Sequence, residues 1–212
     1  IKNLFLEATK DGRIIDVVYN NAGLGHIANI YDLTKEQIRE IIDVNITGMI
    51  MVAKYASEVF TRQKSGHLMF VSSMAGLIVL PEWSVYVASK WAITSFADCI
   101  RMELKPFGIQ VTTVHPGAVK TEFFDPAKAD IDISKLGDAI TSEDVADASY
   151  DAMLTKKHRV LVPASVGAYA GLFKFFPGLV EGLMEKMVSK VEYHEKKGED
   201  EPEFDKELRV KS

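Results

Sequence analysis

The feature that most constrains the fold is a regular alternation of short apolar runs with longer segments of helical period. The apolar runs span residues 14–20, 67–73, 109–117 and 158–163. The helical segments span residues 34–62 and 84–106, and a further one begins at Thr141. Short apolar runs without polar alternation are typical of strands buried on both faces. Their alternation with helices predicts right-handed crossovers, and therefore an α/β fold with a doubly wound parallel sheet and helices on both faces.

Composition excludes several classes of function. The 212 residues fit one domain with a substantial core, and a net charge of −5 without a basic stripe argues against nucleic-acid binding. Cys99 is the only cysteine, and we expect it to be buried because its helix has apolar periodicity. No secretory signal is in view, so a reducing, cytoplasmic location is expected. No metal site is predicted, because no metal-ligand spacing relates Cys99 to the histidines His26, His67, His158 and His194.

The strongest chemical signal is a tyrosine and a lysine four residues apart, Tyr86 and Lys90, with Ser73 and Asn45 upstream. Residues i and i+4 share one helix face, so the two side chains are expected to be neighbours. An ammonium beside a phenol lowers the pKa of the phenol, which makes the phenol a usable acid–base catalyst at neutral pH. Ser73 would hydrogen-bond a substrate oxygen, and Asn45 would hold a water that passes protons to solvent. The set predicts interconversion of a carbonyl and an alcohol.

Five segments around this set carry a family resemblance. They are DVVYNNAG (16–23), DVNITG (43–48), VSSMAG (71–76), YVASKWAI (86–93) and IRMELKPFGIQVTTVHPGAVKT (100–121). In the order and spacing of these segments the chain resembles the short-chain dehydrogenase/reductase family over roughly residues 4–163. The resemblance implies a Rossmann-like fold and an oxidoreductase that uses NAD or NADP on a small carbonyl or alcohol substrate.

The same resemblance assigns a role to each site residue. Tyr86 would be the general acid/base, and Lys90 would modulate its pKa and bind the cofactor ribose. Ser73 would donate to the substrate oxygen, and Asn45 would anchor a proton relay. The residues expected to contact the cofactor are Asn21, Ala22, Gly23, Asn45, Tyr86, Lys90, Pro116, Gly117, Val119 and Thr121. Structural rather than chemical roles are expected for Asn20, Ser72 and His115.

The front of the chain departs from the family pattern. It has no glycine-rich turn to hold a dinucleotide pyrophosphate, because Gly12 is isolated and Gly23 and Gly25 belong to the NNAG segment. Residues 1–13 resemble the tail of a helix. We therefore expect two preceding βαβ units of about 30 residues each to be missing, and the sequence to come from a longer polypeptide. The choice between NAD and NADP cannot be read, because the selecting residue would lie in the missing part.

Three segments are expected along the chain. Residues 1–163 would form the C-terminal part of the Rossmann-like domain, residues 164–191 an apolar helical extension, and residues 192–212 a charged, solvated tail. Charges and a proline interrupt residues 166–190 too often for them to span a bilayer. Three interpretations of that stretch stay open: a lid or wall for a lipophilic substrate, a subunit contact, and an amphipathic helix at a membrane surface.

The helical segments 34–62 and 84–105 are apolar on more than one face, which is typical of buried or interface helices. By the family resemblance they would pack against their symmetry mates in a homodimer or homotetramer. The apolar character of the later segments favours a hydrophobic ketone as substrate. Two other functions remain open: a non-catalytic binding or assembly module, and an epimerase or dehydratase that uses the same tyrosine–lysine pair.

Overall fold

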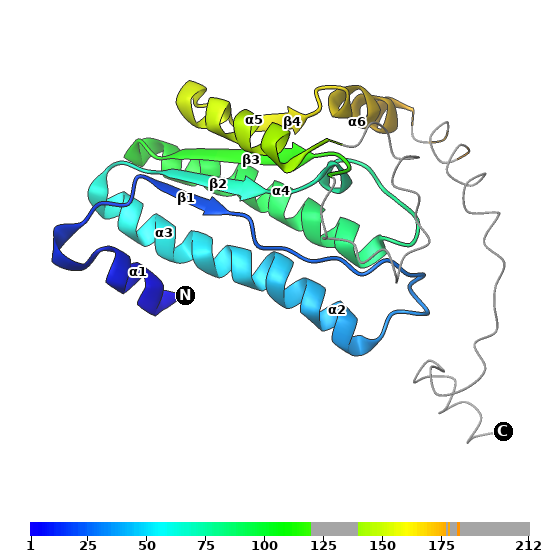
Figure 1. The fold of residues 1–212 in the computed structure, drawn as a ribbon, viewed down its shortest axis with the longest axis horizontal. Coiled ribbons are helices and arrows are strands. Elements are labelled where there is room, and N and C mark those ends of the chain that lie inside the picture. The colour runs from blue at the N-terminus through cyan, green and yellow to red at the C-terminus, as the bar shows by residue number, and fades with distance from the viewer. Residues whose placement is uncertain (120–139, 177, 179–181, 183–212) are drawn as a thin grey trace, which may run out of the picture.

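The computed structural model describes residues 1–119, 140–176, 178 and 182, and these residues form an α/β fold around a parallel sheet (Figure 1). The strands are β1 Val17–Asn20, β2 His67–Val71, β3 Gln110–Pro116 and β4 Arg159–Val162. Their order in the sheet is β1-β2-β3-β4, and every neighbouring pair is parallel. The predicted parallel sheet is therefore confirmed, and the carboxyl ends of its strands meet at one edge.

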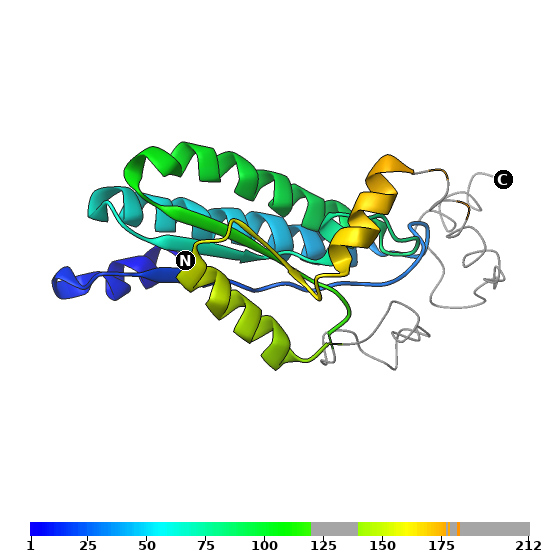
Figure 2. The ribbon, with the colours of Figure 1, turned by 90° about the horizontal axis from the view of Figure 1, so that it is seen from above.

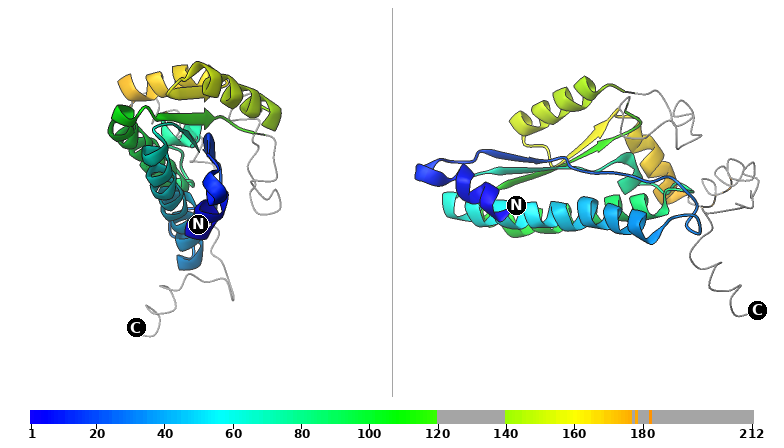
Figure 3. Two further views of the ribbon diagram at one scale, coloured as in Figure 1. Left: turned by 90° about the vertical axis from the view of Figure 1, so that its left-hand side faces the viewer. Right: turned by 60° about the horizontal axis from the view of Figure 1, so that its bottom comes forward.

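The helices lie in two layers, one on each face of the sheet. They are α1 Lys2–Ala8, α2 Lys35–Ile42, α3 Met49–Gln63, α4 Ser84–Leu104, α5 Ser142–Thr155 and α6 Val166–Phe175. Helices α2, α3 and α4 cover one face, and α5 covers the other (Figure 3). Helix α6 follows β4 and lies near the carboxyl ends of the strands (Figure 2). The predicted doubly wound arrangement is thus confirmed.

The helical segment predicted over residues 34–62 contains a local change of winding. Helices α2 and α3 are joined by a π-helical turn, Asp43–Gly48. The start of α2 is fixed by a capping box, in which the Thr34 hydroxyl accepts from the Gln37 backbone N–H and the Gln37 side chain accepts from the Thr34 backbone N–H. π-turns are often found at functional sites, and here the turn carries the fully buried Asn45.

The main core lies between the sheet and the layer formed by α3 and α4. Its fully buried side chains include Met49, Phe60, Leu68, Phe70 and Ile93. Burial of each such side chain contributes about 1.5–3 kcal/mol, so the core holds the sheet firmly on the two helices. The Asn20 amide nitrogen donates to the backbone oxygen of Met49 at 2.9 Å. This bond ties the end of β1 to α3 and confirms the structural role predicted for Asn20.

Helix α4 contradicts one prediction about its outer face. Cys99 is exposed rather than buried. The buried face of α4 runs through Ile93, Ala97 and Ile100, and Cys99 lies nearly opposite Ala97 at 100° per residue. Helix α4 has apolar residues on several faces, and part of that apolar surface, Met102 included, is exposed to solvent. An apolar neighbourhood in the sequence therefore does not establish burial. In the described part of the chain, no helix is long and apolar enough to cross a membrane.

Candidate active site

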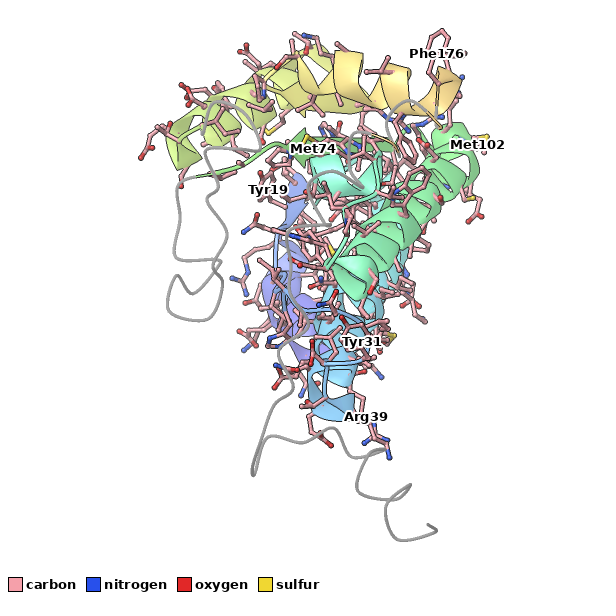
Figure 4. All side chains as sticks on the ribbon, turned by 90° about the vertical axis from the view of Figure 1, so that its right-hand side faces the viewer. Tyr19, Tyr31, Arg39, Met74, Met102 and Phe176 are labelled. Carbon is pink, nitrogen blue, oxygen red and sulfur yellow. The ribbon has the colours of Figure 1, made fainter. Side chains whose placement is uncertain are left out.

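A cavity of about 610 Å³ opens at the carboxyl edge of the sheet. Figure 4 looks onto this edge, with Tyr19 and Met74 of the cavity lining labelled below α5 and α6. Nine of the residues predicted from the sequence line the cavity: Asn21, Ala22, Gly23, Ser73, Tyr86, Lys90, Pro116, Gly117 and Val119. They come from the ends of β1, β2 and β3 and from α4, which is where open α/β sheets bind ligands. Thr121 lies outside the described residues.

Asn45 is fully buried and does not line the cavity. Its Oδ1 accepts from the Leu24 backbone N–H at 2.8 Å, and its Nδ2 donates to the Leu24 carbonyl at 2.8 Å and to the Ser89 hydroxyl at 3.0 Å. Both amide hydrogens are thereby used, and one lone pair of Oδ1 is left for a water. The bonds hold the backbone that follows Gly23 against α4, so Asn45 has a positioning role, and its part in a proton relay stays a prediction.

Tyr86 and Ser73 are brought together at the centre of the cavity. Tyr86 is on the inner face of α4, Ser73 follows β2, and their side chains hydrogen-bond to one another. Burial raises the pKa of Tyr86 to about 12, although the bond from Ser73 acts in the opposite direction. The sequence predicts that Lys90 lowers the pKa of the phenol. In the structure the pKa of Tyr86 is instead above its ordinary value, so this prediction is wrong. Desolvation disfavours the phenolate and is the largest influence on this pKa, while the Lys90 Nζ lies 5.6 Å from the ring centroid.

Lys90 is buried one helical turn after Tyr86. Its Nζ donates to the backbone oxygen of Val71 at 3.2 Å, and burial lowers its pKa to about 8. The ammonium form therefore still predominates at neutral pH. A Cβ at Gly23 would come within 3.2 Å of this Nζ and 3.4 Å of Asn45 Oδ1. Because Gly23 has no side chain, the space next to the Lys90 ammonium stays open. A cationic hydrogen-bond donor beside such a space fits the hydroxyl-rich ribose of a nicotinamide cofactor.

Ser72 and Gly76 bring the chain after β2 onto α4. The Ser72 hydroxyl donates to the Lys90 carbonyl at 3.2 Å and lies 2.9 Å from the Thr94 hydroxyl. These bonds confirm the structural role predicted for Ser72, although both Ser72 and Ser73 line the cavity. A Cβ at Gly76 would lie 2.5 Å from Ser72 Oγ and 2.9 Å from the Lys90 carbonyl. Only glycine allows this close approach.

Substitution of Gly76 by Ala is expected to destabilise the protein by about 1–3 kcal/mol, because the added methyl overpacks a buried contact. Urea unfolding at neutral pH measures the change. The matched control is Gly171→Ala in α6, where a Cβ would meet nothing within 4 Å. That substitution is expected to be neutral or stabilising, since alanine is the better helix former. Equal unfolding midpoints for wild type and the Gly76 variant would show that the contact is not as close as described.

His115 is a positioning residue that the sequence indicated only as strand-end packing. It is fully buried in β3, and its Nδ1 donates to the Ser73 carbonyl at 3.0 Å. Burial lowers its pKa to about 4, so the ring is neutral at physiological pH. Its Nε2 has no partner among the described residues. The side chain thus holds the serine backbone at the cavity, and this contact depends on the parallel pairing of β2 with β3.

In the described ranges, no group of three or more His, Cys, Asp or Glu residues is arranged to hold a metal ion. The basic and acidic groups elsewhere form exposed ion pairs, such as Arg159 with Asp98 at 2.7 Å, and these lie outside the cavity lining. The polar side chains described in the cavity lining are those of Tyr19, Asn21, Ser72, Ser73, Tyr86, Lys90 and Ser142.

Comparison with known proteins gives a consistent result. A family model described as short chain dehydrogenase matches residues 1–132. Dehydrogenase/reductase SDR family member 7B of Xenopus laevis is 31% identical over 162 residues, which are 74% of this chain and 50% of that protein. The chain spans about half the length of the curated relatives it matches.

Two solved structures share the fold. A short-chain dehydrogenase from Sphingobium yanoikuyae in complex with NADPH has a TM-score of 0.69 at 23% identity, and the match covers 92% of this chain and 72% of that one. A short chain dehydrogenase/reductase from Burkholderia phymatum in complex with NAD has a TM-score of 0.73 at 18% identity, covering 84% and 72%. At these identities the likeness establishes the fold.

Proposed function

This chain belongs to the short-chain dehydrogenase/reductase family, and from that premise we propose that it acts as an oxidoreductase. The reaction is interconversion of a ketone or aldehyde and an alcohol, with NAD(H) or NADP(H) as the cofactor. The observation that carries the proposal is the hydrogen-bonded pair of Tyr86 and Ser73 in the cavity, one helical turn from the buried Lys90. Two hydroxyl groups that meet at one point suit a single carbonyl oxygen, which accepts a hydrogen bond from each.

Tyr86 is the proton donor in the direction of reduction. With a pKa of about 12 the phenol is protonated at neutral pH, and it can give its proton to the oxygen that becomes an alkoxide. Ser73 donates a hydrogen bond to the same oxygen and stabilises its developing negative charge. Oxidation of an alcohol requires the phenolate, which a cationic group close to the hydroxyl would favour.

The cofactor supplies hydride exchange when it is bound. Lys90 would hydrogen-bond the ribose of the cofactor, and the missing side chain of Gly23 would leave space for that contact. The cavity residues that would border it are Asn21, Ala22, Pro116, Gly117 and Val119. Asn45 would bind a water through the remaining lone pair of Oδ1 and connect Lys90 with solvent.

The proposed function is tested by following nicotinamide absorbance while NADH or NADPH is offered with a series of ketones. Consumption of one cofactor that depends on both protein and ketone, with the alcohol formed in equal amount, is the expected result. Turnover of substrate without net consumption of cofactor would favour an epimerase or dehydratase. Binding of cofactor without any turnover would favour a binding module. Either outcome would reject the proposed reaction.

We also propose that the chain forms a homodimer or homotetramer through the layer of α3 and α4. Trp91 and Met102 on α4 are 40% and 61% exposed, so part of the outer face of this helix is apolar. Burial of such side chains against a second copy is favourable, at about 25 cal/mol per Å² of apolar area. Sedimentation equilibrium measures the assembly, and a monomer at all concentrations would contradict it.

A further inference from the structure

The end of the cavity that lies next to Tyr86 has an apolar wall. Met74, Leu80 and Trp83 line this end and belong to one buried cluster with Tyr86. Val166 at the start of α6 and the partly buried Phe173 pack against the same cluster. The wall is therefore backed by a helix rather than by solvent, and a ligand that contacts it meets a surface held in place by the core.

Trp83 is the largest side chain in this wall and lies directly beside the catalytic ring. Its ring centroid is 5.6 Å from that of Tyr86, and the two planes are inclined at 66°. Such edge-to-face pairs are favourable and restrict the orientation of both rings. The indole is 7% exposed, and it lines the cavity. A substituent on the carbon that reacts at Tyr86 can therefore lie against the indole.

The backbone before Trp83 is held in a conformation that is unfavourable for its residue. Glu82 has a φ of 67°, in the left-handed region that non-glycine residues rarely adopt. Its carbonyl accepts from the Ala28 backbone N–H at 3.0 Å, and the Trp83 carbonyl accepts from the Val87 N–H at 2.8 Å. Backbone strain of this kind costs about 1–3 kcal/mol and persists where the surroundings enforce it. Here the turn delivers the indole to the cavity at the first turn of α4.

The charge at the cavity is sparse. Among the described lining residues Lys90 alone has a charged side chain, and that side chain is buried and bonded to the Val71 carbonyl. A carboxylate or phosphate on the substrate would lose its hydration against Met74, Leu80 and Trp83, and none of these three side chains offers a cationic partner. Desolvation of an ionised group without a partner is strongly unfavourable. The apolar end of the cavity thus selects against anionic substrates.

We infer that Trp83 determines substrate specificity, and that the substrate class is an uncharged carbonyl compound, or the matching alcohol, with a flat apolar ring beside the reacting carbon. The inference rests on the proposed oxidoreductase function and deepens it. The ring lies against the indole, and the carbonyl oxygen is then within reach of the two hydroxyls of Tyr86 and Ser73.

The inference is tested by comparing kcat/KM for an aryl methyl ketone, a small dialkyl ketone and a 2-oxo acid. Wild type is expected to prefer the aryl ketone and to act poorly on the 2-oxo acid. Trp83→Ala is expected to lower kcat/KM for the aryl ketone by about 10-fold or more, mainly through KM, and to change the value for the dialkyl ketone little. Trp83→Phe should restore part of the preference. The control is Tyr150→Ala, since Tyr150 is an exposed aromatic residue on α5 and does not line the cavity.

A binding measurement separates failure of this inference from failure of the proposed function. The chain has two tryptophans, so Trp91→Phe leaves Trp83 as the only indole fluorophore. Titration of this variant with the aryl ketone is expected to change the Trp83 emission at saturation, and the dialkyl ketone and the 2-oxo acid are expected to change it less. An emission change without turnover would reject the proposed oxidoreductase function, but it would still support binding of the ring against Trp83. No emission change, or an equal loss for all ketones in Trp83→Ala, would overturn the inference.

Discussion

Replacement of Tyr86 by Phe is expected to lower kcat by about 10²–10⁴-fold, the usual contribution of a positioned general acid. The ring and its contact with Trp83 remain, so KM for the ketone should change little. The hydroxyl that donates the proton is lost, and Ser73 alone cannot replace it. Steady-state kinetics with the preferred ketone measure the change.

The matched control for this substitution is Tyr19→Phe. Tyr19 also lines the cavity, but its hydroxyl lies 2.9 Å from the Ser149 hydroxyl and is thereby engaged at the α5 side. Its loss should leave kcat within a small factor of the wild-type value. Comparable losses in the two variants would mean that the cavity needs polar tyrosines in general and that Tyr86 is not the proton donor.

Replacement of Lys90 by Met is expected to weaken cofactor binding by roughly 10–100-fold, because a hydrogen bond to a charged group contributes about 1.5–3 kcal/mol. Methionine keeps most of the volume of the buried side chain, so the fold should persist. Lys35→Met, an exposed lysine on α2, is the control and should leave cofactor binding unchanged. Isothermal titration with NADH and NADPH measures the dissociation constants. Unaltered affinity for both cofactors would remove Lys90 from the binding site.

The pH dependence of cofactor binding provides a second readout for Lys90. Burial lowers the pKa of Lys90 to about 8, so its ammonium is present below that pH and is lost as the pH rises through it. Wild-type affinity for the cofactor should therefore fall above about pH 8. The affinity of Lys90→Met should be lower and should not change across the same range. A wild-type affinity that stays level from pH 7 to well above pH 8 would contradict the assigned role.

The architecture and the location of the site could be predicted from the sequence because both follow from short-range patterns. Apolar runs alternating with helical periods specify a parallel sheet, and the carboxyl ends of parallel strands meet at one edge. Asn21 and Gly117 follow a strand directly and Ser73 is the second residue after one, so their meeting at the cavity is a consequence of the topology. The spacing of Tyr86 and Lys90 on one helix adds the remaining groups.

The electrostatics of the site could not be predicted in the same way. The spacing of Tyr86 and Lys90 gives proximity along α4, but the direction of a pKa shift depends on burial and on where the ammonium points. In the folded chain Lys90 donates to Val71, and burial dominates the pKa of the phenol. Sequence periodicity likewise does not distinguish a half-exposed apolar face of a helix from a buried one. For this reason the prediction that Cys99 is buried is wrong.

The roles of His115 and Trp83 depend on contacts between residues distant in the chain or on backbone conformation. His115 meets the Ser73 carbonyl across the pairing of β2 with β3, 42 residues away in sequence. Trp83 lines the cavity directly after Glu82, whose left-handed conformation no propensity would assign to glutamate. Both residues are visible in the sequence as types, and their roles emerge only with the fold.

The most direct test of the central claim is transfer of deuterium from the nicotinamide to the substrate. The purified protein is incubated with an aryl methyl ketone and with NADH or NADPH that carries deuterium at both positions of the reactive ring carbon, and the product is analysed by mass spectrometry. The account predicts an alcohol with deuterium on its carbinol carbon, formed by wild type and nearly absent with Tyr86→Phe. An unlabelled alcohol, or labelled alcohol formed equally well by Tyr86→Phe, would contradict hydride transfer with Tyr86 as the acid.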